Sequence, residues 1–296
     1  MQIMSLITAL PGAAAQGLIW GIMAIGVYIT FRILDIADLT VDGTLCTGGA
    51  VCIMMMLSGH NVWVSMLAAT GAGLLAGLAT GIFHTFMGIP AILAGILTQL
   101  SLYSVNLKIM GKANQAINVD KFNLLVSLRR VKGVALTQNT LFIVAIMIII
   151  LIAVLYWFFG TELGCSLRAT GCNPSMSRAQ GINTDRNKVL GLMLSNGLVA
   201  LSGALLTQYQ GFADINMGRG SIVIGLAAVI IGEAIFSRIF RNFALKLLSV
   251  VFGSILYYLV LQIVIWMGID TDLLKMLSAL VVAFFLAFPY WKGKYF

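Results

Sequence analysis

The chain has 296 residues, of which 60% are hydrophobic and only 9% are charged, and its mean hydropathy is +1.01. This composition excludes a soluble globular domain with an ordinarily charged surface. The formal net charge of +8 does not indicate nucleic-acid binding, because the basic residues fall in short segments between apolar stretches, as topology signals and lipid-headgroup contacts do. We therefore expect an integral membrane protein embedded in the lipid bilayer, with no nucleic-acid partner.

Apolar stretches long enough to cross a bilayer as helices recur along the whole sequence, separated by charged, Asn/Gly or Pro-containing joints. We place roughly nine of them, at 13–33, 44–58, 62–86, 90–108, 139–160, 188–208, 219–236, 247–266 and 273–290. Two longer polar segments, 109–138 and 161–187, lie between spans. The sequence predicts an all-α polytopic membrane protein, with 1–296 as a single transmembrane domain that includes broken helices.

The first joint, "DIADLTVDGT", places Asp38 and Asp42 inside an apolar run. A charge in the hydrocarbon is costly, so such residues usually face a cavity or a partner. They are equally suited to be N-caps of a helix that restarts inside the membrane, where Asp38 or Thr40 satisfies freed amides and Gly43 relaxes the backbone. Both interpretations, cap and transport path, stay open, and one broken helix end can serve both.

A second stretch, "FADINMGRGSIVIGLAAV", resembles the first in the order of its residue types. Asp214 and Asn216 take the places of Asp38 and Thr40. By the span count, the first copy follows an inward-running helix and the second an outward-running one, as an inverted repeat requires. Matching broken helices in two halves indicate a transport path. The candidate path residues are Asp38, Thr40, Asp42, Asp214 and Asn216.

The segment "NPSMSRAQG" is predicted to form a short helix with defined ends. Asn173 is a good N-cap, Pro174 suits the first helical position, and Gly181 suits the left-handed position after the last turn. Such a short helix is marginal alone, so we expect another surface to hold it, with Met176 as an apolar contact and Arg178 as a charged one. The candidate contact set is Asn173, Pro174, Ser175, Met176, Ser177, Arg178, Ala179, Gln180 and Gly181.

The orientation rests on this same region. Roughly nine spans place the termini on opposite faces, and the basic tail "WKGKYF" places the C-terminus in the cytoplasm. Segment 161–187 is then cytoplasmic and 109–138 external. The Lys and Arg residues are nearly balanced between the two faces, so the charge bias alone does not fix the orientation.

The cytoplasmic segment carries two patterns of a known family, T-x-x-G-x-x-x-R-A and G-I-N-T-x-R. The matching residues are Thr161, Gly164, Arg168 and Ala169, then Gly181, Ile182, Asn183, Thr184 and Arg186. The chain thereby resembles the permease family of bacterial ABC importers that serves branched-chain amino acids and ribose-like sugars. The detail "ADLTVDGT" is closer to a branch associated with aromatic amino acids, tryptophan or tyrosine.

This resemblance implies a type II-like importer permease in the bacterial inner membrane, in which helix 173–181 is a coupling helix docked on an ATPase subunit. It implies further partners: a second permease subunit, most simply an identical one, and an external binding protein that delivers a small solute, most simply an amino acid. ATP and Mg²⁺ would bind to the ATPase. The chain itself would hold no catalytic residue, cofactor or metal, and neither Gly111-Lys112-Ala113 nor Gly293-Lys294-Tyr295 completes a P-loop.

Two other classes remain. An ion-coupled secondary transporter would use Asp38, Asp42 and Glu233 as carriers, although Glu233 has possible partners in Arg238 or Arg241. A membrane-embedded enzyme would need converging nucleophile, base or metal residues, which two isolated histidines, His60 and His84, and scattered acids do not supply. Single polar residues within spans, Gln99, Asn196 and Gln262, are expected to hydrogen-bond between helices.

Overall fold

The computed structural model describes residues 2–119, 122, 124–131, 139–236, 240 and 242–267, and positions 273, 276, 279, 280, 282–284 and 287. The predicted span 273–290 and the basic tail lie largely outside the described residues. The same holds for Arg238, Arg241 and part of the predicted external segment 109–138.

The helices follow the predicted spans closely. The order is α1 (Gln2–Tyr28), a π-helical turn η1 (Ile29–Ile33), α2 (Val41–Leu57), α3 (Val62–Thr85), α4 (Ala91–Met110), the 3₁₀ turn η2 (Leu128–Val131), α5 (Thr140–Gly160), α6 (Glu162–Cys172), α7 (Pro174–Ala179), α8 (Thr184–Gln210), α9 (Ser221–Phe236) and α10 (Phe243–Trp266). Six helices are long and apolar enough to cross a membrane, and α2 and α9 are shorter apolar helices. Each of the first eight predicted spans contains a helix; the total of nine is not established.

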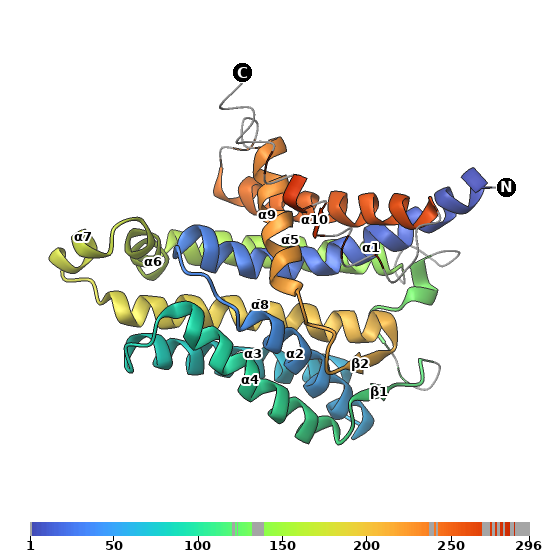
Figure 1. Ribbon diagram of the computed structural model, residues 1–296, viewed down its shortest axis with the longest axis horizontal. Helices are drawn as coiled ribbons and strands as arrows, with labels where there is room; N and C mark the ends of the chain where they lie inside the picture. The colour runs from blue at the N-terminus through green and yellow to red at the C-terminus, as the bar shows by residue number, and fades with distance from the viewer. Residues whose placement is uncertain are drawn as a thin grey trace.

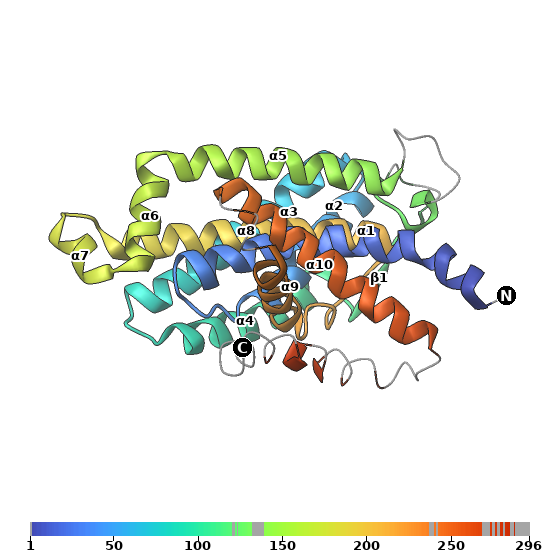
Figure 2. The ribbon, with the colours of Figure 1, turned by 90° about the horizontal axis from the view of Figure 1, so that it is seen from above.

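The long helices α1, α5, α8 and α10 run along the long axis of the molecule, whereas α9 crosses it (Figures 1 and 2). Helices α6 and α7 form one end of this axis, and the N-terminus and the β1–β2 region form the other (Figure 1). Segment 161–187 and the described part of 109–138 therefore lie at opposite ends, as the span count requires. Their assignment as cytoplasmic and external stays a prediction.

The largely helical chain contains one short pair of strands that the sequence did not indicate. Strand β1 (Asn114–Ala116) pairs antiparallel with β2 (Phe212–Asp214). Helices α4 and α8 both end at a glycine in the left-handed conformation, Gly111 (φ 68°) and Gly211 (φ 81°). The chain turns sharply after each helix, and the two following segments meet. Pairing between segments so far apart leaves no local sequence pattern.

The short helix α2 packs directly on α8 at two glycines. A Cβ added at Gly203 of α8 would collide with the carbonyl oxygen of Leu45, and one added at Gly48 of α2 would collide with the backbone of Ala200. Small residues permit this close backbone approach between membrane helices. The packing holds the broken helix α2 against the longest described membrane segment.

We expect Gly203→Ala to destabilise the fold by about 1–3 kcal/mol, because the two backbones must separate to admit the methyl group. The thermal unfolding midpoint of the detergent-solubilised protein would be measured. Gly71→Ala is the matched control, since a Cβ there meets nothing within 4 Å. Equal midpoints for the two variants would contradict the close α2–α8 contact.

Candidate functional site

Asp38 lies in a buried polar network just before α2. The residue is only 2% exposed. Its Oδ1 accepts a hydrogen bond from the Thr40 amide at 2.9 Å, and its Oδ2 accepts one from Asn196 Nδ2 at 2.7 Å. Thr44 Oγ1 donates to Asn196 Oδ1 at 2.7 Å. Asn196 therefore connects α8 to α2, as expected for a polar residue within a span, and Asp38 satisfies a freed amide as expected for a cap.

Thr40 extends this network to two more helices. Its hydroxyl lies 2.7 Å from that of Thr80 on α3, and Thr80 donates to Thr98 on α4 at 2.9 Å. All three threonines are buried. The side chains of Asp38 and Thr40 thus join four segments of the bundle, and contact with a passing solute stays a prediction for both.

Asp42 caps a helix, but not the one that the sequence indicated. Its Oδ2 accepts from the Gly220 amide at 2.8 Å, and its Oδ1 accepts from the Ile222 amide at 3.0 Å and the Ser221 hydroxyl at 2.9 Å. Although Asp42 belongs to the first turn of α2, it satisfies the free amides of α9. The two short helices therefore begin side by side.

Asp42→Ala should destabilise the protein by about 1–2 kcal/mol, the usual effect of losing a helix cap. Hydrogen–deuterium exchange would be followed at the first amides of α9, which should exchange faster in the variant. Asp185→Ala, which removes an exposed carboxylate from the first turn of α8, should leave α9 unchanged. Unaltered protection of α9 in Asp42→Ala would contradict the cap.

The second motif forms the same local turn as the first. Asp214 Oδ1 accepts from the Asn216 amide at 2.7 Å, as Asp38 Oδ1 does from the Thr40 amide. Asn114 Nδ2 also donates to Asp214 Oδ2 at 3.4 Å. Each turn precedes one of the two short apolar helices, which supports the repeat inferred from sequence. Asp38 and Asp214 nevertheless do not share one site, because Asp38 is enclosed within the bundle and Asp214 lies in the β1–β2 pair.

A cavity of about 250 Å³ lies where α2, α4 and the turn before α9 meet. Its lining consists of Asp42, Gly43, Cys46, Gln99, Leu100, Tyr103, Asn106, Ile215 and Arg219. Asn106 is 1% exposed, and its Oδ1 has no hydrogen-bond partner within the described part of the chain. An unsatisfied buried acceptor is unusual and gives this cavity an open binding group.

Sequence reasoning missed most of this lining. Tyr103, Asn106 and Arg219 were not singled out, and Gln99 was expected to bridge helices. The available signal is the spacing of Gln99, Tyr103 and Asn106, which puts three polar side chains on one face of α4. Only the fold brings Arg219 to that face.

Helix α7 has the ends that its sequence predicts. Asn173 Oδ1 accepts from the Met176 amide at 3.0 Å, Pro174 is the first helical residue, and Gly181 has φ +81°. Met176 is 62% exposed, whereas Ser177 is buried. The other exposed members of the contact set are Asn173, Ser175, Arg178, Ala179, Gln180 and Gly181. The helix projects at one end of the molecule (Figure 2), and its role as a coupling helix stays a prediction.

Helix α6, which precedes α7, was not anticipated as a separate element. Thr161 caps it by accepting from the Gly164 amide at 3.3 Å, a signal present in "TELG". Its Thr170 accepts from Asn187 of α8 at 2.8 Å, and Gly171 lies directly against the backbone of Ile33. Helix α6 therefore connects α7 to both α8 and the π-helical end of α1.

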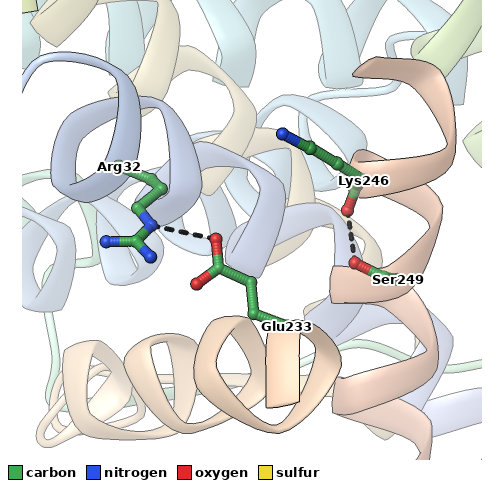
Figure 3. A network of polar contacts seen from close by, with 4 residues as sticks. All are labelled: Arg32, Glu233, Lys246 and Ser249. Atoms are coloured by element: carbon green, nitrogen blue, oxygen red, sulfur yellow. Dashed lines mark hydrogen bonds and ion pairs between the residues drawn. The ribbon is translucent and has the colours of Figure 1, made fainter. Parts of the chain in front are cut away.

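Glu233 pairs across the bundle with a residue distant in sequence. Its Oε1 lies 2.9 Å from Nε of Arg32 (Figure 3). The sequence suggested Arg238 or Arg241, which lie outside the described residues. Arg32 is distant in sequence, so the choice of partner depends on how α1 and α9 pack.

Comparison with known proteins agrees with this architecture. A family profile described as the permease component of branched-chain amino acid transport systems matches residues 10–286. The chain is 38% identical over 272 residues to a "Tyrosine transport system permease protein" of Clostridioides difficile (strain R20291), covering 92% of this chain and 88% of the relative. It is 38% identical over 281 residues to an uncharacterized protein, RP368, of Rickettsia prowazekii (strain Madrid E), covering 94% and 95% of the two chains.

A solved structure, titled "PsaBC from Streptococcus pneumoniae in complex with Fab", matches with a TM-score of 0.55 and 18% identity over 99% of each chain. At that identity the match shows a shared fold. The apolar helices and the family match define a multi-pass permease of the bacterial inner membrane. The chain belongs to the permease component family of branched-chain amino acid transport systems, and is a transport protein of the ABC type.

Proposed function

We propose that the chain is the membrane-spanning subunit of an ATP-driven importer that carries an amino acid, with an aromatic amino acid as the first candidate. Family membership supports the transport role. The name of the relative from Clostridioides difficile, a tyrosine transport permease, supports the choice of solute. An external binding protein delivers the solute to the end of the molecule that holds β1 and β2.

The proposal rests chiefly on the form and exposure of helix α7. The helix is capped at both ends and projects beyond the bundle, with Met176 exposed for contact. In our proposal this helix docks on an ATPase subunit, which binds ATP and Mg²⁺. Because α6 connects α7 to α8 and to the end of α1, a displacement of α7 would reach the helices that hold the buried network.

We place the solute path beside the cavity between α2, α4 and the turn before α9. The Arg219 guanidinium there suits the carboxylate of the solute, and the Tyr103 ring suits its side chain. Asn106 Oδ1, which has no partner among the described residues, suits its ammonium group. A second copy of the permease would face this side of α4. Asp214 and Asn216 stand at the start of the same route, Asp42 lines it, and Asp38 and Thr40 support it from within the bundle.

An ion-coupled carrier is the alternative, and the acids give it little support. A carrier carboxylate must bind and release its ion, yet Asp38 and Asp42 have both oxygens hydrogen-bonded within the chain and Glu233 is paired with Arg32. These contacts fit fixed structural roles better than exchange with a transported ion.

The test is uptake of radiolabelled tyrosine by proteoliposomes that contain the chain with the subunits that co-purify with it. We expect uptake that requires the binding protein outside and ATP with Mg²⁺ on the ATPase side, and that survives dissipation of proton and sodium gradients by ionophores. Uptake by the chain alone, driven by an ion gradient, would overturn the proposal. ATP-driven uptake of ribose but not of tyrosine would overturn only the choice of solute.

A further inference from the structure

A large pocket lies at the α7 end of the molecule, away from the cavity assigned to the solute. Its volume is about 860 Å³, and it is lined by η1, the end of α5, α6 and the start of α10. Three cationic side chains reach it, Arg32, Arg168 and Lys246, together with the aromatic residues Tyr156 and Trp157. Neither the transport path nor the contact set of α7 uses these residues.

The positive charge of this pocket is only partly compensated. Glu233 neutralises Arg32 at 2.9 Å, and Lys246 extends towards that pair without an ionic partner among the described residues (Figure 3). Arg168 lies 5.8 Å from the ring centroid of Phe243 and makes one weak contact, from Nη2 to Cys165 Sγ at 3.4 Å. The ring positions Arg168, and most of the guanidinium donors have no partner among the described residues. Two positive charges therefore remain for an anion.

The apolar wall of the pocket continues along the outer face of α5. Trp157 is 71% exposed and Tyr156 50%, and both lie near the C-terminal end of the helix, where aromatic residues mark the membrane–water boundary. Before them, Ile149 and Ile150 are exposed on the same helix. Such an exposed apolar surface on a membrane-spanning helix suits contact with acyl chains.

We propose that this pocket binds the phosphodiester headgroup of an anionic phospholipid. Lys246 and Arg168 hold the phosphate, Tyr156 and Trp157 border the glycerol region, and the acyl chains lie along α5. Basic pockets between membrane helices have this chemistry, and the guanidinium of Arg168 suits a phosphate. Because the pocket opens onto the apolar face of α5, a lipid fills it more completely than free phosphate does.

The proposal is tested by native mass spectrometry of the purified protein titrated with phosphatidylglycerol or phosphatidylcholine of identical acyl chains. We expect one phosphatidylglycerol to be retained far more strongly than phosphatidylcholine. In the double variant Arg168→Gln/Lys246→Gln that binding should weaken roughly thirty-fold, the effect of two basic residues near a membrane surface. Arg186→Gln, a loss of one exposed charge at the same end, should bind phosphatidylglycerol as the wild type does.

The substituted side chains are partly or fully exposed, and Lys246→Arg, which keeps the charge, should retain lipid binding. Equal retention of the two lipids by the wild type, or unchanged phosphatidylglycerol binding in the double variant, would overturn the proposal. A further arm adds glycerol 3-phosphate, which has no acyl chains, to the protein with phosphatidylglycerol bound. Displacement of phosphatidylglycerol by this soluble phosphate at equal concentration would assign the pocket to a soluble anion and overturn the lipid.

Discussion

Asn196→Ala is expected to be among the most damaging single substitutions in the chain. Asn196 is fully buried, and its amide is the link between the carboxyl group of Asp38 and the hydroxyl of Thr44. Alanine removes the donor to Asp38 and the acceptor for Thr44 at once. Asp38 Oδ2 then stays enclosed without a donor. Leaving a buried acidic group uncompensated costs roughly 3 kcal/mol or more.

The expected result is a large fall in the thermal unfolding midpoint and in the yield of monodisperse protein in detergent. Asn216→Ala is the matched control, because Asn216 is exposed and only its backbone amide bonds to Asp214. A normal midpoint for Asn196→Ala would show that the buried network does not hold α2 against α8.

Arg178→Glu is expected to abolish transport while the membrane fold survives. Arg178 is exposed on α7, and its Nε makes one long contact, to the carbonyl of Pro174 at 3.4 Å. The side chain therefore contributes little to folding, whereas reversal of its charge disfavours a partner surface selected for a cation. We expect at least about a ten-fold loss of affinity for the ATPase subunit.

The measurement pairs uptake with binding of the ATPase subunit to the solubilised permease. Arg178→Lys, which keeps the charge, should retain most of both. Lys112→Glu reverses an exposed charge at the opposite end of the molecule and should leave ATPase binding intact. If Arg178→Glu binds the ATPase normally, α7 is not the docking element.

The features predictable from sequence are those determined by neighbouring residues. The span positions follow from apolar length, and the ends of α7 follow from Asn173, Pro174 and Gly181. Two similar turns, at Asp38–Thr40 and at Asp214–Asn216, each depend on residues two apart. The repeat can therefore be inferred from the sequence alone.

The features missed depend on which segments meet in space. The sequence leaves Asp42 open between a helix cap and a path residue, and only the packing of the two short helices makes it the cap of α9. The pairing of Arg32 with Glu233 and that of β1 with β2 likewise join segments distant in sequence. In the cavity, Tyr103 and Arg219 are unremarkable residues until α4 and the turn before α9 come together.

The central claim is most directly tested by affinity purification of the tagged wild-type chain in mild detergent, with mass spectrometry of what co-purifies. Our account predicts a stoichiometric ATP-binding subunit, which is lost when residues 174–180 are replaced by Gly/Ser while the permease itself is still recovered. A single-chain oligomer that accumulates solute in proteoliposomes without ATP would contradict the account and identify an ion-coupled carrier.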